Sequence, residues 1–237
     1  MRSVFLLTIR QLSGWRRLAI MAVLAALPVV FTLLLLAEDT TDSVRQFESV
    51  VLGGMLAGSI IPLVVLAIAA AAFGNEVEDR TLANLTISPL PRWKIALPKL
   101  LATIAVAGPF IAASALATAY FAFLGDPTAT MAVTVAALAG VAMYAAVFVF
   151  LGLLSPQAIG IGLLYIVLWE GLLSGFVAGV RLLSIRYYSM ALMQGLDEQR
   201  FAGQDLPNLT VAVTLTAIVI AGSTMLTVRK LRRMDVP

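Results

Sequence analysis

Long stretches without any charge alternate with short polar stretches along this chain of 237 residues. A helix needs roughly 20 apolar residues to cross about 30 Å of hydrocarbon. Stretches of that length predict six membrane-spanning helices, at residues 18–37, 49–74, 100–125, 130–154, 158–180 and 206–228. We therefore expect an all-α, polytopic membrane protein in which residues 1–237 form a single transmembrane domain.

The boundary between the fourth and fifth predicted spans is set by the Ser-Pro-Gln sequence at residues 155–157. Residues 127–169 carry no charge over 43 positions. As one helix they would extend about 64 Å, which is twice the hydrocarbon thickness. The chain must fold back once within this stretch, and the proline marks the best break.

The first 17 residues have a different pattern. Phe5, Ile9 and Leu12 recur at helical spacing among four arginines, which predicts an amphipathic helix in the membrane interface over residues 1–17. A cleaved signal peptide is the alternative. The sequence argues against it, because the apolar run starts late, is long, and ends without a small-x-small cleavage pattern.

Composition supports the membrane assignment and excludes several kinds of chemistry. Hydrophobic residues make up 61% of the chain and charged residues 12%, with a mean hydropathy of +0.99. A soluble domain would carry about 25% charged residues. The chain has no cysteine, no histidine and no phosphate-binding loop sequence. We expect no enzymatic activity, no metal site, no cofactor and no nucleic-acid partner for this chain.

The distribution of charge predicts the orientation. With both termini in the cytoplasm, twelve of the 16 basic residues lie on the cytoplasmic side, and eight of the 13 acidic residues lie outside. This bias follows the positive-inside rule for a multi-pass protein of the cell membrane. Residues 75–99 are then cytoplasmic, and residues 181–205 are extracytoplasmic.

The polar stretch at residues 75–99, here called the coupling segment, holds the strongest functional pattern. Its acidic residues would lie at the start of a short helix, where carboxylates favour the positive end of the helix dipole. Leu82 and Leu85 are three residues apart and share one face of such a helix. Pro89 would end it, because proline lacks the amide donor.

The pattern of the coupling segment resembles the segment between spans two and three of ABC-2 type transporter permeases. The residues that carry the resemblance are Glu76, Glu78, Asp79, Arg80, Thr81, Leu82, Leu85, Pro89, Arg92 and Lys99. The topology is similar too. The resemblance implies a coupling helix that docks on a separate ATP-binding subunit, which holds ATP and Mg. It also implies an exporter that works as a homodimer, or as a heterodimer with a related permease.

Within this interpretation, Leu82 and Leu85 would supply the apolar contact with the ATP-binding subunit. Arg92, Lys94 and Lys99 would lie at the level of the lipid phosphates and hold the segment against the membrane. The alternative is an ordinary amphipathic loop whose basic residues only set the topology.

Glu170 is the acidic residue that lies inside a predicted span. A carboxyl group there is costly and usually faces protein or a water-filled cavity. It is either a polar contact for substrate or part of a gate, or it forms a hydrogen bond that holds the fifth span to a neighbour. Beside it, Gly171, Gly175 and Gly179 form a small-residue stripe that packs either against a second subunit or within this one.

Other functions remain open at this stage. Residues 181–205 could cap the transport pathway as short helices, or form a solvated loop. An ion- or proton-coupled secondary carrier that uses Glu170 is the main alternative to the ATP-driven transporter. A membrane scaffold or intramembrane enzyme is a third alternative, which the missing histidine and cysteine disfavour.

Overall fold

The fold was analysed in a computed structural model, which describes residues 2–37, 47–78, 91–173, 181, 183–201 and 206–233. The described residues form helices and connecting turns, without a strand. The elements are α1 (Arg2–Leu12), α2 (Trp15–Ala37), η1 (Phe47–Ile60), α4 (Ile61–Glu78), α6 (Trp93–Ala122), α7 (Pro127–Leu154), α8 (Ala158–Leu164), η2 (Tyr165–Leu173), α11 (Ile185–Leu196) and α12 (Leu209–Arg233). The elements labelled η are π-helical.

Within the described ranges, five helices are long and apolar enough to cross a membrane. They are Trp15–Ala37, Ser49–Gly74, Trp93–Ala122, Pro127–Leu154 and Leu209–Arg233, and they correspond to the first four predicted spans and the sixth. The predicted fifth span is represented by a shorter apolar helix, Ala158–Leu172. The all-helical membrane fold is therefore confirmed, and the sixth crossing stays a prediction.

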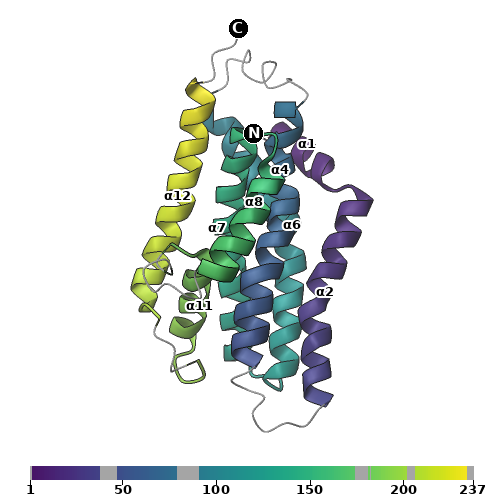
Figure 1. The fold of residues 1–237 in the computed structure, drawn as a ribbon, viewed down its shortest axis with the longest axis vertical. Coiled ribbons are helices and arrows are strands. Elements are labelled where there is room, and N and C mark those ends of the chain that lie inside the picture. The colour runs from purple at the N-terminus through teal and green to yellow at the C-terminus, as the bar shows by residue number, and fades with distance from the viewer. Residues whose placement is uncertain are drawn as a thin grey trace.

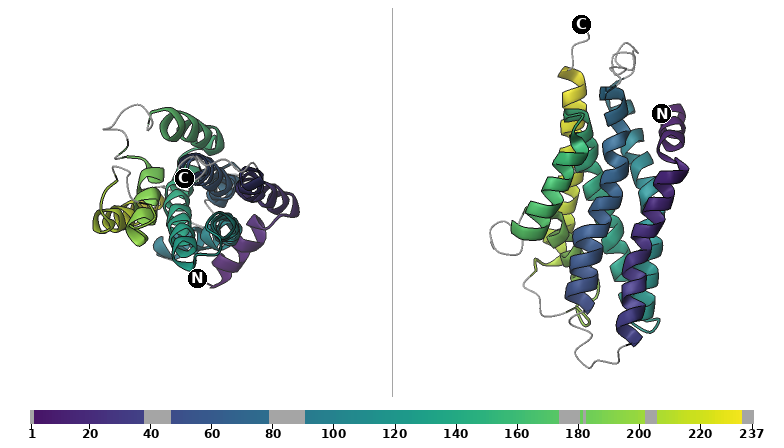
Figure 2. Two further views of the ribbon diagram at one scale, coloured as in Figure 1. Left: turned by 90° about the horizontal axis from the view of Figure 1, so that it is seen from below. Right: turned by 45° about the vertical axis from the view of Figure 1, so that its right-hand side comes forward.

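The helices pack side by side along the long axis of the molecule (Figure 1). Helices α4, α6 and α7 form the centre, while α2 and α12 lie on opposite flanks. The stretch Ser49–Gly74 is the most buried of the five candidate spans, and Leu209–Arg233 is the least buried. Figure 2 shows that α8 and η2 run at a tilt to the other helices.

Glycine permits the closest helix contacts in this bundle. A Cβ atom added at Gly152 of α7 would lie 2.8 Å from the backbone carbonyl oxygen of Ala70 in α4. At Gly162 of α8 it would lie 2.3 Å from a methyl group of Leu66. Small residues at helix crossings let backbones approach in this way. The fold thus places α7 and α8 directly against α4.

The start of α1 and the end of α12 lie at the same end of the bundle (Figure 1). The last turn of α4 and the first turn of α6 are found there as well, and the turn between α6 and α7 lies at the opposite end together with α11. The coupling segment therefore begins and ends on the same side as the start of α1 and the end of α12.

Two predicted boundaries differ from the structure. Helix α1 ends at Leu12 and α2 begins at Trp15, so the first helix is shorter than the expected 1–17, with Ser13 and Gly14 between the two. Helix α6 begins at Trp93 rather than near residue 100, and it continues through Pro98. A proline removes one helical hydrogen bond, and membrane helices tolerate that loss.

Candidate functional site

The coupling segment is described only at its two ends. The backbone of Glu76 and Glu78 forms the last turn of α4. Six of the predicted coupling residues lie outside the described residues: Asp79, Arg80, Thr81, Leu82, Leu85 and Pro89. The short helix expected there stays a prediction, while the positions of α4 and α6 fix where the segment leaves and rejoins the bundle.

At the start of α6, the side chains point in different directions. Trp93 is 41% exposed, and the Lys94 Nζ lies 5.7 Å from the centroid of its ring. Arg92 precedes the helix and is half-buried. An exposed tryptophan beside basic residues is typical of a helix end at the membrane interface. These residues fit the predicted anchoring role, which no observation here tests.

Lys99 does not fit that role. Its side chain is 1% exposed, its ammonium group donates to the carbonyl oxygen of Ala72 in α4, and its Nζ lies 4.3 Å from the ring centroid of Phe73. The expected position at the lipid phosphates is wrong. The reason is that α6 begins at Trp93, which places Lys99 in the second helical turn, facing α4.

Glu170 is fully buried and accepts three hydrogen bonds. Its carboxyl oxygens accept from the Tyr165 hydroxyl at 3.0 Å, the Ser184 hydroxyl at 2.5 Å and the Ile185 backbone amide at 2.9 Å. Ser184 is the N-cap residue of α11, and its Oγ accepts from the Tyr187 amide at 3.2 Å. The carboxyl group therefore holds the first turn of α11, where unpaired amides and the helix dipole favour an acceptor.

These hydrogen bonds are of the kind that the structural alternative for Glu170 requires, with α11 as one partner, and the role of Glu170 stays a prediction. Aromatic residues of α7 surround the same point. Tyr144 stacks on Phe148 with ring centroids 5.6 Å apart, and Phe148 meets Tyr165 edge-on at 6.2 Å. The hydrogen-bonded group is thus packed against the centre of the bundle.

The glycine stripe is described at only one of its positions. A Cβ atom added at the exposed Gly171 would contact only the Ile166 carbonyl oxygen of its own helix, at 3.6 Å. Gly175 and Gly179 lie outside the described residues. Gly171 therefore packs against no other described helix of this chain, and a role for the stripe stays a prediction.

The predicted extracytoplasmic segment contains a packed helix. Helix α11 buries a face that includes Tyr188, Met190 and Met193. Burial raises the pKa of the Tyr188 phenol, and the neighbouring Tyr187 raises it further, so Tyr188 stays neutral near pH 7. Ile185–Leu196 is therefore a packed helix rather than a solvated loop, and its role in capping the transport pathway stays a prediction.

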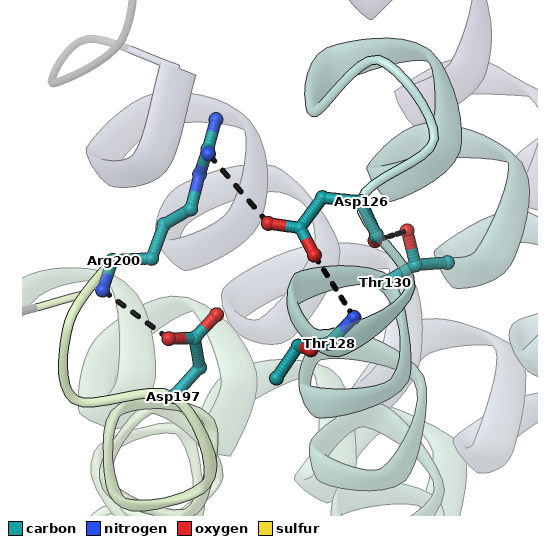
Figure 3. A network of polar contacts seen from close by, with 5 residues as sticks. All are labelled: Asp126, Thr128, Thr130, Asp197 and Arg200. Atoms are coloured by element: carbon teal, nitrogen blue, oxygen red, sulfur yellow. Dashed lines mark hydrogen bonds and ion pairs between the residues drawn. The ribbon is translucent and has the colours of Figure 1, made fainter.

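A polar network joins the end of this segment to the turn between α6 and α7 (Figure 3). Asp126 caps α7 by accepting from the Thr128 amide at 3.0 Å, and its other oxygen lies 3.8 Å from Arg200 Nη1. The Arg200 guanidinium lies 4.5 Å from the ring centroid of Phe123. Phe123 also meets Phe201 edge-on at 5.6 Å. This network holds the turn between α6 and α7 against the end of the predicted extracytoplasmic segment.

A surface groove of about 450 Å³ lies between α2 and α6. It is lined by Ala22, Ala25, Ala26, Val29, Pro109, Phe110, Ala113 and Ser114. The lining contains no titratable side chain, so the groove offers shape and hydrocarbon contact rather than chemistry. Among the described residues, no group of three or more His, Cys, Asp or Glu side chains could hold a metal ion.

Sequence reasoning missed the partners of Glu170 and the Asp126 network. The sequence does contain a capping signal for the start of α11 and for the start of α7. Ser184 precedes an apolar-periodic run, and Asp126 is followed by proline, and both patterns are typical of N-caps. The contacts across helices, however, depend on tertiary packing that the sequence pattern does not encode.

The described helices define an all-α, multi-pass membrane protein. The sequence matches the family described as ABC-2 family transporter protein over residues 15–180, which is more than half of the chain. The chain therefore belongs to the ABC-2 transporter family, as the resemblance of the coupling segment implied. No curated protein matches the sequence.

Proposed function

We propose that this chain is the membrane-spanning permease subunit of an ATP-driven exporter, and that a separate ATP-binding subunit hydrolyses the ATP. The observation that carries the proposal is the family match over residues 15–180. It is supported by the position of the α4 and α6 ends at the same end of the bundle as the start of α1 and the end of α12, because a cytoplasmic partner could then reach all of them from one side.

In this proposal the ATP-binding subunit docks on the coupling segment through Leu82 and Leu85. Closure of two such subunits on ATP would push on the segment and displace α4 and α6, the helices it connects. Two copies of the chain, or one copy and a related permease, would enclose the pathway. The six-span topology has residues 158–180 as the fifth crossing, and the termini face the cytoplasm.

A secondary carrier with Glu170 as its proton site is less well supported. Three donors in its own or the following element bond to Glu170, and the carboxyl group is fully buried. A carrier site must exchange its proton with water on each side in turn. The observed contacts favour a fixed structural role.

Co-purification from the native membrane in mild detergent tests the proposal. We expect an ATP-binding subunit to remain bound to the wild type and to be lost from the double variant Leu82→Asp with Leu85→Asp. The matched control is Leu124→Asp with Leu183→Asp, because both leucines are strongly exposed and lie outside the coupling segment. Absence of an ATP-binding subunit from the wild type would refute the proposed function.

A further inference from the structure

Lys99 and Ala72 lie at matching depths beneath the coupling segment. Ala72 is six residues before the end of α4, and Lys99 is six residues after the start of α6. At 1.5 Å per residue, each lies about 9 Å from the end of its helix. The contact between the Lys99 ammonium and the Ala72 carbonyl oxygen therefore joins the two helices at the base of the segment.

The way in which Lys99 is buried is unusual for a lysine near a helix end in a membrane. Such a side chain commonly extends to the interface, which leaves its charged group in water. Here the side chain instead crosses to α4, where the ammonium meets the Ala72 carbonyl and the face of the Phe73 ring. Burial of a charge is costly, and partners of this kind offset the cost. The contact makes the position of α6 relative to α4 specific.

The backbone around Lys99 is held as well. The Thr103 hydroxyl donates to the Lys99 carbonyl oxygen at 2.9 Å, and the neighbouring Ile95, Ala96 and Leu100 are buried. The lysine therefore extends from a fixed turn of α6 rather than from a loose end. Force applied to either side of the coupling segment reaches this contact within two turns of each helix.

We propose that Lys99 is a positioning residue that ties α6 to α4, so that both helices move as one unit when the coupling segment is displaced. The inference rests on the proposed function for the source of that displacement. The tie itself is a property of the chain and is testable without the ATP-binding subunit.

Electron paramagnetic resonance between two spin labels, one on α4 and one on α6, measures the separation of the two helices directly. The chain has no cysteine, so Gly74→Cys and Leu101→Cys provide unique label sites in this subunit. A Cβ atom at Gly74 meets nothing within 4 Å, and Leu101 is 52% exposed. The separation is recorded for the purified chain, and for its complex with the ATP-binding subunit, before and after trapping with ATP and vanadate.

The variants separate charge from packing. Lys99→Met keeps the length and apolar stem of the side chain but removes the ammonium group, and Lys99→Arg keeps a charged donor. Lys230→Met is the matched control, because Lys230 lies in the last turn of α12. Replacing a buried charge by an apolar group can raise stability. For that reason the assay measures position rather than melting temperature.

We expect one narrow separation in the wild type that does not change on trapping. In Lys99→Met the population with separated helices should rise roughly tenfold or more, the factor that loss of a charge-assisted hydrogen bond gives, and it should increase further on trapping. Lys99→Arg should restore the narrow distribution, and Lys230→Met should match the wild type. A merely structural role would not make the separation depend on nucleotide.

Two results would overturn the inference: a Lys99→Met distribution identical to that of the wild type with and without nucleotide, or a wild-type pair that separates on trapping. If no ATP-binding subunit binds the wild type, the proposed function fails. The separation measured in the purified chain then tests the contact between α6 and α4 by itself. An unchanged distribution of separations in Lys99→Met overturns the inference.

Discussion

Removal of the Glu170 carboxyl group should release the first turn of α11. In Glu170→Gln one oxygen remains, so at least one of the three donors, the Tyr165 hydroxyl, the Ser184 hydroxyl or the Ile185 amide, loses its acceptor. A buried donor without a partner costs about 1–3 kcal/mol. The two hydroxyl groups can rotate toward other acceptors, but the Ile185 amide is fixed by the backbone. We expect about 1–2 kcal/mol for Glu170→Gln and about 3 kcal/mol for Glu170→Ala.

Hydrogen exchange measured by mass spectrometry on the purified protein reports this loss of stability for each helix separately. The energies correspond to exchange of the α11 amides that is faster by roughly 5- to 30-fold in Glu170→Gln and by roughly 150-fold in Glu170→Ala. Exchange in α4 should change little, because none of these three donors belongs to α4. The matched control is Glu198→Gln, since Glu198 is exposed on the same segment.

The location of the faster exchange is as informative as the size of the increase. If α11 exchanges at the wild-type rate in Glu170→Ala, the three hydrogen bonds contribute nothing to its position and the reasoning is wrong. If exchange rises equally throughout the bundle, Glu170 stabilises the whole fold rather than one helix start. Only an increase confined to α11 and its contacts supports the assignment made from the geometry.

Three further outcomes test packing, capping and orientation. Gly152→Ala should destabilise the protein by about 1–3 kcal/mol in thermal unfolding, because the new Cβ would lie 2.8 Å from the Ala70 carbonyl oxygen, whereas Gly222→Ala meets open space and should not. Asp126→Ala should cost about 1 kcal/mol in the same assay, mainly through the lost cap of α7, because its ion pair is partly exposed. Leu124→Cys should react with a membrane-impermeant thiol reagent in intact cells, because Leu124 is exposed and the proposed orientation places it outside the cell. If this cysteine does not react, the proposed orientation is wrong.

The spacing of apolar residues predicted the helices whose signal is local. Runs of uncharged residues place α2, α7 and the helical stretch Ser49–Gly74 correctly within a few residues, because length and hydropathy alone decide whether a helix can cross a membrane. The start of α6 was predicted near residue 100, after the polar segment that ends at Lys99, whereas the helix begins at Trp93 and continues through Pro98. In a bundle, neighbouring helices compensate for the lost hydrogen bond, and that compensation is not visible in the sequence.

The site was predictable only to the level of residue type. A carboxyl group inside a span predicts that it has a partner, and the partners of Glu170 include Tyr165, Ser184 and Ile185. Which donors it meets depends on α11 folding back against η2, and that contact depends on burial of apolar residues spread over several helices. The position of an acceptor next to a helix start is therefore a tertiary result rather than a local one.

The two buried ionisable side chains together suggest which parts of the bundle move as units. Among the described residues, Lys99 and Glu170 are the charged side chains that are buried. Lys99 joins α6 to α4, and Glu170 joins η2 to α11, while α7 packs against α4, α6 and α11. Packed interfaces shift between discrete arrangements rather than deform continuously. We infer that displacement at the coupling segment moves α4 and α6 together against α7, and that α7 carries the change to α11 at the other end.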